Sequence, residues 1–142
     1  MKKNLLVALS AAFLIVSCRK EEKQSANCNQ TMSSIAGSYK LTAMKYKSNA
    51  GAAETDIFSS LDPCLKDDLI RYKTDGTFDY LDQGTVCDPS ESHNGLWSLT
   101  GNRMTVNGET MTIRDFNCTD LVLFREGLFT PGDIMTLTYH KQ

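Results

Sequence analysis

The side chains that most often carry out chemistry are sparse in this chain. His93 and His140 are the only histidines, and the topology derived below puts them at opposite ends of the fold, too far apart for a shared zinc site. The adjacent carboxylates Asp67 and Asp68 would point to opposite faces of a strand, which suits neither acid–base catalysis nor calcium, so we expect a structural or solvated role. There is no G-x-S-x-G elbow and no phosphate-binding glycine loop. The sequence therefore predicts no enzyme activity, no metal site and no cofactor.

The five cysteines are the other reactive side chains, and their odd number leaves at least one outside any internal disulfide. Cys18 follows an uncharged, mostly apolar run, Leu5–Ser17, that begins after Lys2 and Lys3. As a helix this run spans about 20 Å, short of the ~30 Å hydrocarbon core of a membrane, and a charge cluster follows it. Residues 1–17 therefore predict an export signal rather than a membrane span.

The end of that run, Ile15-Val16-Ser17-Cys18, resembles the lipobox of bacterial lipoproteins. The resemblance implies that Cys18 is acylated and becomes the first residue of the mature chain, and several acyl chains give a stable anchor. The next residues, Arg19–Lys23, are similar to the charged tag of surface-exposed lipoproteins of Bacteroidetes-type bacteria. This implies an outer-membrane, cell-surface lipoprotein, with a periplasm-facing one as the alternative. A secreted protein and a plain membrane anchor are the alternatives to lipidation.

Removing residues 1–17 takes away two lysines and no acid, so the formal charge goes from −2 to −4. The remaining 125 residues fit one domain. Basic residues are scattered, which predicts no nucleic-acid binding. Ser25–Ser34 is polar and small and is typical of a tether, so we expect a lipidated cysteine and flexible tether over 18–34 and a folded domain over 35–142.

From Tyr39 onward, short alternating segments separated by Gly and Asn/Asp turns predict an all-β fold. We expect an eight-stranded antiparallel up-and-down barrel, with a helical turn near Glu54–Leu61. The expected strands are Tyr39–Tyr46, Leu69–Lys73, Thr77–Asp82, Leu96–Leu99, Arg103–Val106, Glu109–Arg114, Asp120–Arg125 and Ile134–His140.

Turn chemistry predicts the strand registers. In KTDGTF, a three-residue loop with Gly76 left-handed pairs Tyr72 with Phe78 and Ile70 with Tyr80, which puts these four apolar residues on one face. The turns at residues 101–102 and 107–108 likewise predict the pairs Leu99–Met104, Trp97–Val106 and Met104–Met111.

An up-and-down barrel gathers its connections at two ends. The long loops, Ser48–Asp67 and Gln83–Asn94, lie at one end, which faces away from the membrane, and the tether enters at the end with the tight turns. This topology brings Cys64 to Cys87 at the long-loop end and Cys28 to Cys118 at the tether end, so we predict both disulfides, which export permits. The alternative is four free thiols in a redox or metal site, although there is no C-x-x-C and no Cys beside a His.

Four segments carry a family resemblance: GSYKLTAM, CLKDDLIRYKTDGTFDY, CDPSESHNGLWSL and MTLTYHK. They resemble the lipocalin-like domain of Bacteroidetes lipoproteins, which implies an antiparallel barrel with a cavity for a small apolar molecule. The inward-facing residues expected to line this cavity are Tyr39, Tyr72, Phe78, Tyr80, Trp97, Met104, Met111, Met135 and Tyr139. The registers also point inward Leu41, Ile70, Leu99, Val106, Ile113, Leu121, Leu123 and Leu137.

Eight strands can either hold one small ligand or fill the barrel with side chains. The first case predicts a lipoprotein that binds a small hydrophobic molecule or an envelope component. The second predicts a filled barrel that acts as a cell-surface protein-interaction module through its long loops. Ile57, Phe58 and Leu61, in the first long loop, would form a lid over the mouth or pack on its rim.

Overall fold

The computed structural model describes residues 28–142, and the predictions made for the signal sequence and for Cys18 lie outside these residues. The strands are β1 (Gly37–Lys47), β2 (Thr55–Asp56), β3 (Leu69–Tyr72), β4 (Thr77–Leu81), β5 (His93–Thr100), β6 (Arg103–Val106), β7 (Glu109–Phe116), β8 (Asp120–Glu126) and β9 (Ile134–Lys141). The short helices are α1 (Met32–Ile35), η1 (Phe58–Ser60) and α2 (Pro63–Lys66). Between residues 28 and 142 no helix has the length and apolar character needed to cross a membrane.

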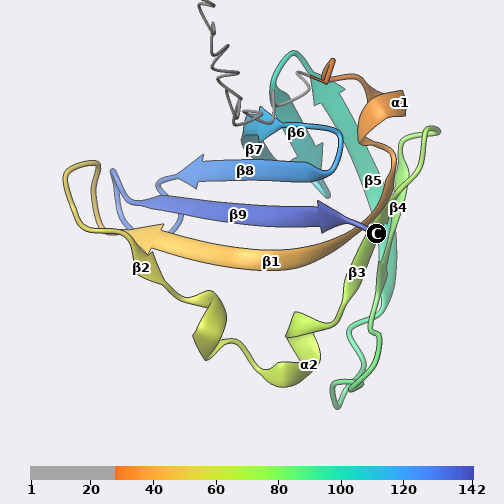
Figure 1. The fold of residues 1–142 in the computed structure, drawn as a ribbon, viewed down its shortest axis with the longest axis horizontal. Helices are drawn as coiled ribbons and strands as arrows, with labels where there is room; N and C mark the ends of the chain where they lie inside the picture. Colours follow the sequence, from red (N-terminus) through yellow and green to blue (C-terminus); the bar gives the residue numbers. More distant parts are fainter. Residues whose placement is uncertain (1–27) are drawn as a thin grey trace, which may run out of the picture.

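The strands form one antiparallel sheet in the order β2-β1-β3-β4-β5-β6-β7-β8-β9, and β1 also pairs with β9. This second pairing closes the sheet, so that β1 lies between β3 and β9 (Figure 1). The two-residue β2 adds only a short hairpin to the far end of β1. The eight-stranded up-and-down barrel predicted from the sequence is therefore confirmed, and closure leaves the longer strands without free edges.

The predicted registers are confirmed as well. Tyr72 pairs with Phe78 in the β3–β4 hairpin, where Gly76 has a φ of 85°. The β6–β7 turn places Asn107 and Gly108 at φ values of 48° and 86°, the left-handed pair that a two-residue hairpin needs. The other confirmed pairs are Ile70–Tyr80, Leu99–Met104, Trp97–Val106 and Met104–Met111.

Two β-bulges shift the inward-facing positions along their strands. In β7, the register shifts between Ile113 and Asp115, so the alternation of inward- and outward-facing side chains moves along by one residue. Phe116 therefore points inward and is 2% exposed. In β1, a shift after Leu41 has the same effect and places Met44 opposite Leu137. Strict alternation of two residues could not predict either inward position.

Apolar side chains fill the barrel. All 17 residues predicted to face inward are buried or partly buried, and all except Met135 belong to or pack against one hydrophobic cluster. At the centre of this cluster the Tyr72 ring lies 6.0 Å from Tyr39, 6.1 Å from Phe78 and 5.1 Å from Trp97, measured between ring centroids. The Trp97 indole donates to the backbone oxygen of Lys73 at 2.8 Å, which satisfies its polar group.

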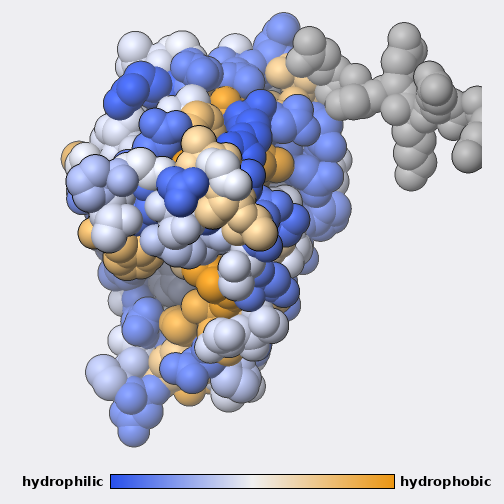
Figure 2. All heavy atoms as spheres, turned by 90° about the vertical axis from the view of Figure 1, so that its left-hand side faces the viewer, coloured by the Kyte–Doolittle hydropathy of each residue, from blue (hydrophilic) through white to orange (hydrophobic). Residues whose placement is uncertain are grey.

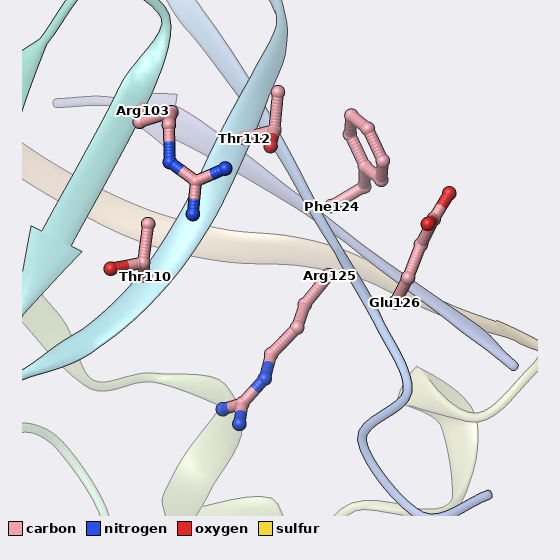
Figure 3. A pocket seen from close by; sticks show the side chains of 6 residues that line it. All are labelled: Arg103, Thr110, Thr112, Phe124, Arg125 and Glu126. Carbon is pink, nitrogen blue, oxygen red and sulfur yellow. The ribbon is translucent and has the colours of Figure 1, made fainter. Parts of the chain in front are cut away.

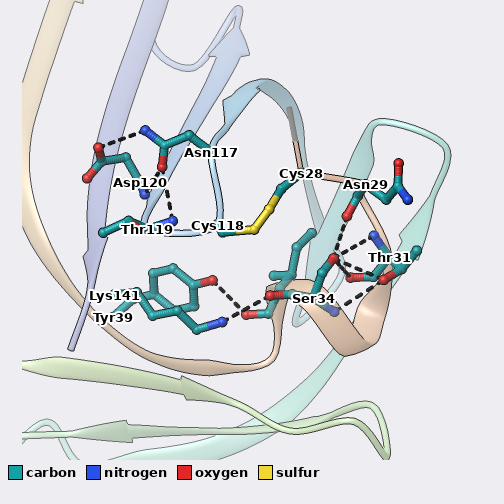
Figure 4. The surroundings of a disulfide bond; sticks show 11 residues. Cys28, Asn29, Thr31, Ser34, Tyr39, Asn117, Cys118, Thr119, Asp120 and Lys141 are labelled. Atoms are coloured by element: carbon teal, nitrogen blue, oxygen red, sulfur yellow. Dashed lines mark hydrogen bonds between the residues drawn. A yellow bond between two sulfur atoms is a disulfide. The ribbon is translucent and has the colours of Figure 1, made fainter. Parts of the chain in front are cut away.

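Helix α1 closes the tight-turn end of the barrel. Thr31 caps this helix through a reciprocal pair of hydrogen bonds with Ser34, and Ile35 at its end is completely buried in the core. The Tyr39 hydroxyl donates to the Ile35 carbonyl at 2.7 Å, and Lys141 Nζ donates to the Ser34 carbonyl at 3.0 Å (Figure 4). The flexible tether expected over 18–34 is thus corrected for residues 31–34, which are folded into the domain.

A disulfide fixes the chain just before this helix. Cys28 is bonded to Cys118 in the β7–β8 turn, with a Cα–Cα distance of 5.5 Å (Figure 4). Cys118 has a φ of 74°, and the side-chain oxygen of Asn117 accepts hydrogen bonds from the backbone N–H groups of Thr119 and Asp120 in this turn. The predicted pairing at the tether end is confirmed, and residue 28 is held at the pole opposite the long loops.

Candidate ligand site at the open mouth

The opposite pole of the barrel is built from the long loops. The β1–β3 connection docks on β1 through the hydrogen bond from Ile57 N to the Met44 carbonyl at 2.9 Å, and α2 follows beneath the mouth. The disulfide between Cys64, in α2, and Cys87, in the β4–β5 loop, joins the two longest loops with a Cα–Cα distance of 5.3 Å. This confirms the second predicted pairing. Ile57, Phe58 and Leu61 stay partly exposed, and none of them lines the mouth cavity described below, as expected of a rim.

Carboxylates organise the β4–β5 loop. Asp82 accepts hydrogen bonds from Cys87 N at 3.2 Å and Glu91 N at 3.1 Å. Asp67 Oδ2 accepts one from Thr85 N at 2.9 Å, while its buried Oδ1 has no partner among residues 28–142. These bonds give the acidic residues the structural role that the sequence analysis expected for the aspartate pair.

Asp68 is the carboxylate that reaches the barrel interior. Its side chain is 5% exposed. Oδ2 accepts from the Tyr80 hydroxyl at 2.7 Å, and Oδ1 accepts from the backbone N–H of Gln83 at 3.1 Å. These two bonds tie the start of β3 to β4 and to the loop that follows it, at the level where the barrel opens.

A cup of about 50 Å³ lies at this level. Its wall combines residues of the mouth with inward-facing residues of the strands, and most of this wall is apolar. Its lining residues are Leu41, Leu65, Asp68, Ile70, Tyr80 and Tyr139. Since a water molecule occupies about 30 Å³ of liquid, the cup has room for about two water-sized groups. It can take the end of a ligand but not a whole one.

The phenol groups around the cup are neutral at physiological pH. Burial raises the pKa of Tyr139 to about 12. Burial, and then the neighbouring Tyr139 and Tyr39, raise the pKa of Tyr72 well above its ordinary value. The pKa of Tyr80 is raised first by burial and then by its hydrogen bond to Asp68. The remaining polar residue of the cup wall is a carboxylate, Asp68.

Of the nine residues predicted to line a cavity, two line the cup and seven do not. Tyr80 and Tyr139 do line the cup. The other seven correct that prediction, because they fill the interior or lie against it: Tyr39, Tyr72, Phe78, Trp97 and Met104 in the packed core, Met111 against it, and Met135 buried beyond it. Leu41 and Ile70 were expected to face inward and were not among the residues expected to line the cavity. Leu65 and Asp68 were missed, because no strand alternation extends into α2 and the segment after it.

His93 and His140 lie at opposite ends of the barrel, as predicted. His93 stacks on the Tyr80 ring at the mouth, with ring centroids 5.1 Å apart, and His140 Nδ1 lies 2.7 Å from Asp120 Oδ1 near the closed pole. Among residues 28–142, no group of three or more His, Cys, Asp or Glu side chains could hold a metal ion.

A separate hollow lies on the outer wall of the barrel. It has a volume of about 290 Å³ and is lined by side chains of β6, β7 and β8 (Figure 3). Arg125 is paired with Glu109, and Arg114 lies 4.9 Å from the centre of the Phe124 ring, so two of the cations near this hollow already have partners. The lining residues are Arg103, Thr110, Thr112, Phe124, Arg125 and Glu126.

Apolar side chains also project from the loops at the open pole. Phe129, in the β8–β9 loop, is 69% exposed, and Val86, in the β4–β5 loop, is 60% exposed. Phe129 packs edge-on against Tyr46, with ring centroids 5.9 Å apart. Figure 2 looks at the side where β1 ends and shows apolar residues gathered in the middle and lower part of this face, among polar ones.

Comparison with known families gives a match over the barrel. The family model of the lipocalin-like domain matches residues 35–123, which covers six of the eight barrel strands in full and the first part of β8. A comparison with curated proteins finds no match.

Proposed function

Because the chain belongs to the lipocalin-like domain family, we propose that its barrel binds a small hydrophobic molecule or an envelope component at the open mouth. The observation that carries this proposal is the cup: an apolar depression at the loop end of a barrel whose family fold is suited to such ligands. We propose a binding role rather than a catalytic one.

The size of the cup limits how the ligand is held. Pockets that enclose a drug-sized ligand measure about 300–1,000 Å³, several times more than the 50 Å³ cup. The core below it is occupied by Tyr72, Trp97 and Met104, which are at most 3% exposed. The ligand therefore inserts only its end, and the rest of it lies against the loops of the open pole.

We further propose that the protein is a lipoprotein, attached through Cys18 to the outer membrane and exposed on the cell surface. The apolar run, Ser17 and Cys18 support this from the sequence. The bond between Cys28 and Cys118 adds support, because a chain that enters at the closed pole leaves the mouth facing away from the membrane. Metabolic labelling with an alkynyl fatty acid tests the anchor: the chain takes up label and the Cys18→Ser variant does not. Labelling of Cys18→Ser would contradict it.

Ligand binding is tested by native mass spectrometry of the protein purified from its own host. We expect a bound small molecule that is lost from a Leu65→Arg variant, whose long charged side chain blocks the cup. Val86→Arg is the matched control, because it adds the same charge at an exposed position of the same pole. An apo mass for the native protein, together with no binding of apolar fragments in solution, would contradict the proposal.

The filled interior favours a second function, a protein-interaction module. Phe129 and Val86 are large apolar side chains exposed at the pole that faces away from the proposed anchor. In this case the partner contacts the loops and no small molecule is needed. Crosslinking on intact cells distinguishes the two functions, because Phe129→Ser would abolish a partner crosslink and leave the occupancy of the cup unchanged.

A further inference from the structure

Asp68 is the one carboxylate among the residues that line the cup. Asp68 is 5% exposed, and no Lys, Arg or His nitrogen among residues 28–142 lies within 4.0 Å of its carboxylate. Hydrogen bonds from Tyr80 and from Gln83 N satisfy one position on each oxygen. A buried carboxylate normally has a cation beside it, because removing a charge from water is costly.

The surroundings of Asp68 strengthen the negative potential at the mouth. Asp67 and Asp82 bind backbone N–H groups of the same loop, so two further carboxylates lie at this pole. None of the six residues that line the cup is a lysine or arginine. An anionic ligand end, such as a fatty carboxylate, would meet repulsion here and no compensating cation.

Tyr139 provides a second polar contact. It is 9% exposed and lines the cup, and its hydroxyl makes no hydrogen bond with another residue between 28 and 142. A neutral phenol oxygen can accept a hydrogen bond, and each Asp68 oxygen has a lone pair left after its contact with Tyr80 or Gln83. The residues that line the cup therefore include Asp68 and Tyr139, whose oxygens can accept a hydrogen bond, and the apolar Leu41, Leu65 and Ile70.

We propose that the cup selects a primary alkylammonium group, with the ammonium against Asp68 and Tyr139 and its first methylene between the leucine and isoleucine side chains. Two water-sized groups fill about 50 Å³, which matches one methylene and one ammonium. A trimethylammonium head has four non-hydrogen atoms, which makes five with its first methylene, and it does not fit. This inference rests on the proposed function, since it assigns the ligand class of the same cup.

The test uses the full chain and four probes of equal chain length: butylammonium, butanol, butyrate and butyltrimethylammonium. Chemical-shift titration of the Leu65, Asp68 and Ile70 amides reports binding. We expect butylammonium to bind at least about tenfold more tightly than butanol. Both head groups can donate a hydrogen bond to Asp68, but the ammonium adds the attraction between opposite charges, which is stronger at a partly buried site than in water. Butyrate and butyltrimethylammonium should give no saturable shifts.

Two variants separate the cup from general attraction to an acidic surface. Asp68→Asn should remove the preference for the amine over the alcohol, whereas Asp67→Asn makes the same charge change on the neighbouring residue outside the cup and should preserve it. Tyr139→Phe removes only the hydroxyl and should weaken amine binding several-fold while butanol binding is unchanged, which keeps the test usable if Asp68→Asn fails to fold.

Three results would overturn the inference. Equal binding of butanol and butylammonium in the cup would leave the proposed apolar site intact but remove its selectivity. Equal binding of butyltrimethylammonium would show that surface charge alone attracts the cation. No binding of any probe would overturn the selectivity and the proposed site together.

Discussion

The Tyr80 hydroxyl donates to Asp68 Oδ2 at 2.7 Å, and this bond joins β4 to the start of β3 at the mouth of the barrel. Through Oδ1 the same carboxylate accepts from Gln83 N and so anchors the β4–β5 loop. The same buried carboxylate therefore stabilises the fold and lines the cup. For this reason, the effect of an Asp68 variant on binding must be compared with its effect on stability. Tyr80→Phe provides that comparison, because it removes the donor and leaves the charge.

We predict that Tyr80→Phe lowers the free energy of unfolding by about 1.5–3 kcal/mol, the usual contribution of a hydrogen bond to a charged group. Urea unfolding of the variant and the native chain measures this change. A change below about 0.5 kcal/mol would show that the bond to Asp68 is replaced by water at no cost.

Helix α1, which closes the tight-turn end of the barrel, is held in the core by Ile35. We predict that Ile35→Ala lowers the free energy of unfolding by about 2–5 kcal/mol, because the side chain is completely buried and its removal leaves a cavity. Leu96→Ala is the control, since Leu96 is 69% exposed on the outer wall, and its effect should stay within about 0.5 kcal/mol. Equal effects in urea unfolding would mean that α1 is not part of the folded unit.

The two disulfides should differ in their contribution to stability. Cys28 and Cys118 are 90 residues apart, and Cys64 and Cys87 are 23 apart. If only the entropy of loop closure counts, replacing the first pair by serines should lower the free energy of unfolding by about 1 kcal/mol more than replacing the second pair. Thermal unfolding of the two double variants measures the order of stability. The reverse order would show that the Cys64–Cys87 bond holds native contacts that the entropy argument omits.

Acid should loosen the β8–β9 loop through Asp133. Burial raises the pKa of Asp133, but hydrogen bonds from the backbone N–H groups of Thr130, Phe129 and Leu128 outweigh it and bring the pKa below its ordinary value of 3.8. A lowered carboxyl pKa stabilises the fold above the unfolded pKa, and this contribution is lost as the pH falls through the folded one. The stability gap between the native chain and Asp133→Asn should therefore be constant near neutrality and shrink below about pH 4.

Urea unfolding as a function of pH measures that gap, and the fluorescence of a reporter dye on the β8–β9 loop shows whether the loop moves with it. Asp75→Asn is a suitable comparison. The pKa of Asp75 is also lowered, first by the side-chain hydrogen bond of Thr77, but it lies in a turn at the other pole. A gap for Asp133→Asn that widens as the pH falls would contradict the assignment.

The sequence predicted the barrel well because local chemistry determines its registers. Gly76 and the Asn107-Gly108 pair each need a left-handed backbone, and a shift of one residue would turn every apolar side chain in the paired strands to the wrong face. Trp97 and Phe78 are buried at the predicted positions for this reason. Phe116 was missed because a bulge depends on tertiary packing and has no sequence signal in β7.

The closed pole and the interior volume were harder to predict. Met32–Ile35 is a single helical turn in a polar segment, and the Thr31–Ser34 cap was the only local signal for it. Whether eight strands enclose a cavity depends on how bulky side chains from all of them meet at the centre. This packing depends on side chains from the whole fold, so the sequence alone could not decide between a filled interior and a cavity for a ligand. Leu65 reaches the cup from α2, which the Cys64–Cys87 disulfide ties to the β4–β5 loop.

The central claim is that the core is filled and that ligands are held only at the mouth. Methyl chemical shifts measured while the full chain is titrated with butanol test it most directly. The account predicts saturable shifts for the methyl groups of Leu41, Leu65 and Ile70, with those of Met104, Leu121 and Leu123 unchanged. Shifts of equal size at Met104 and Leu121 would show that the probe enters the barrel, and would contradict the claim.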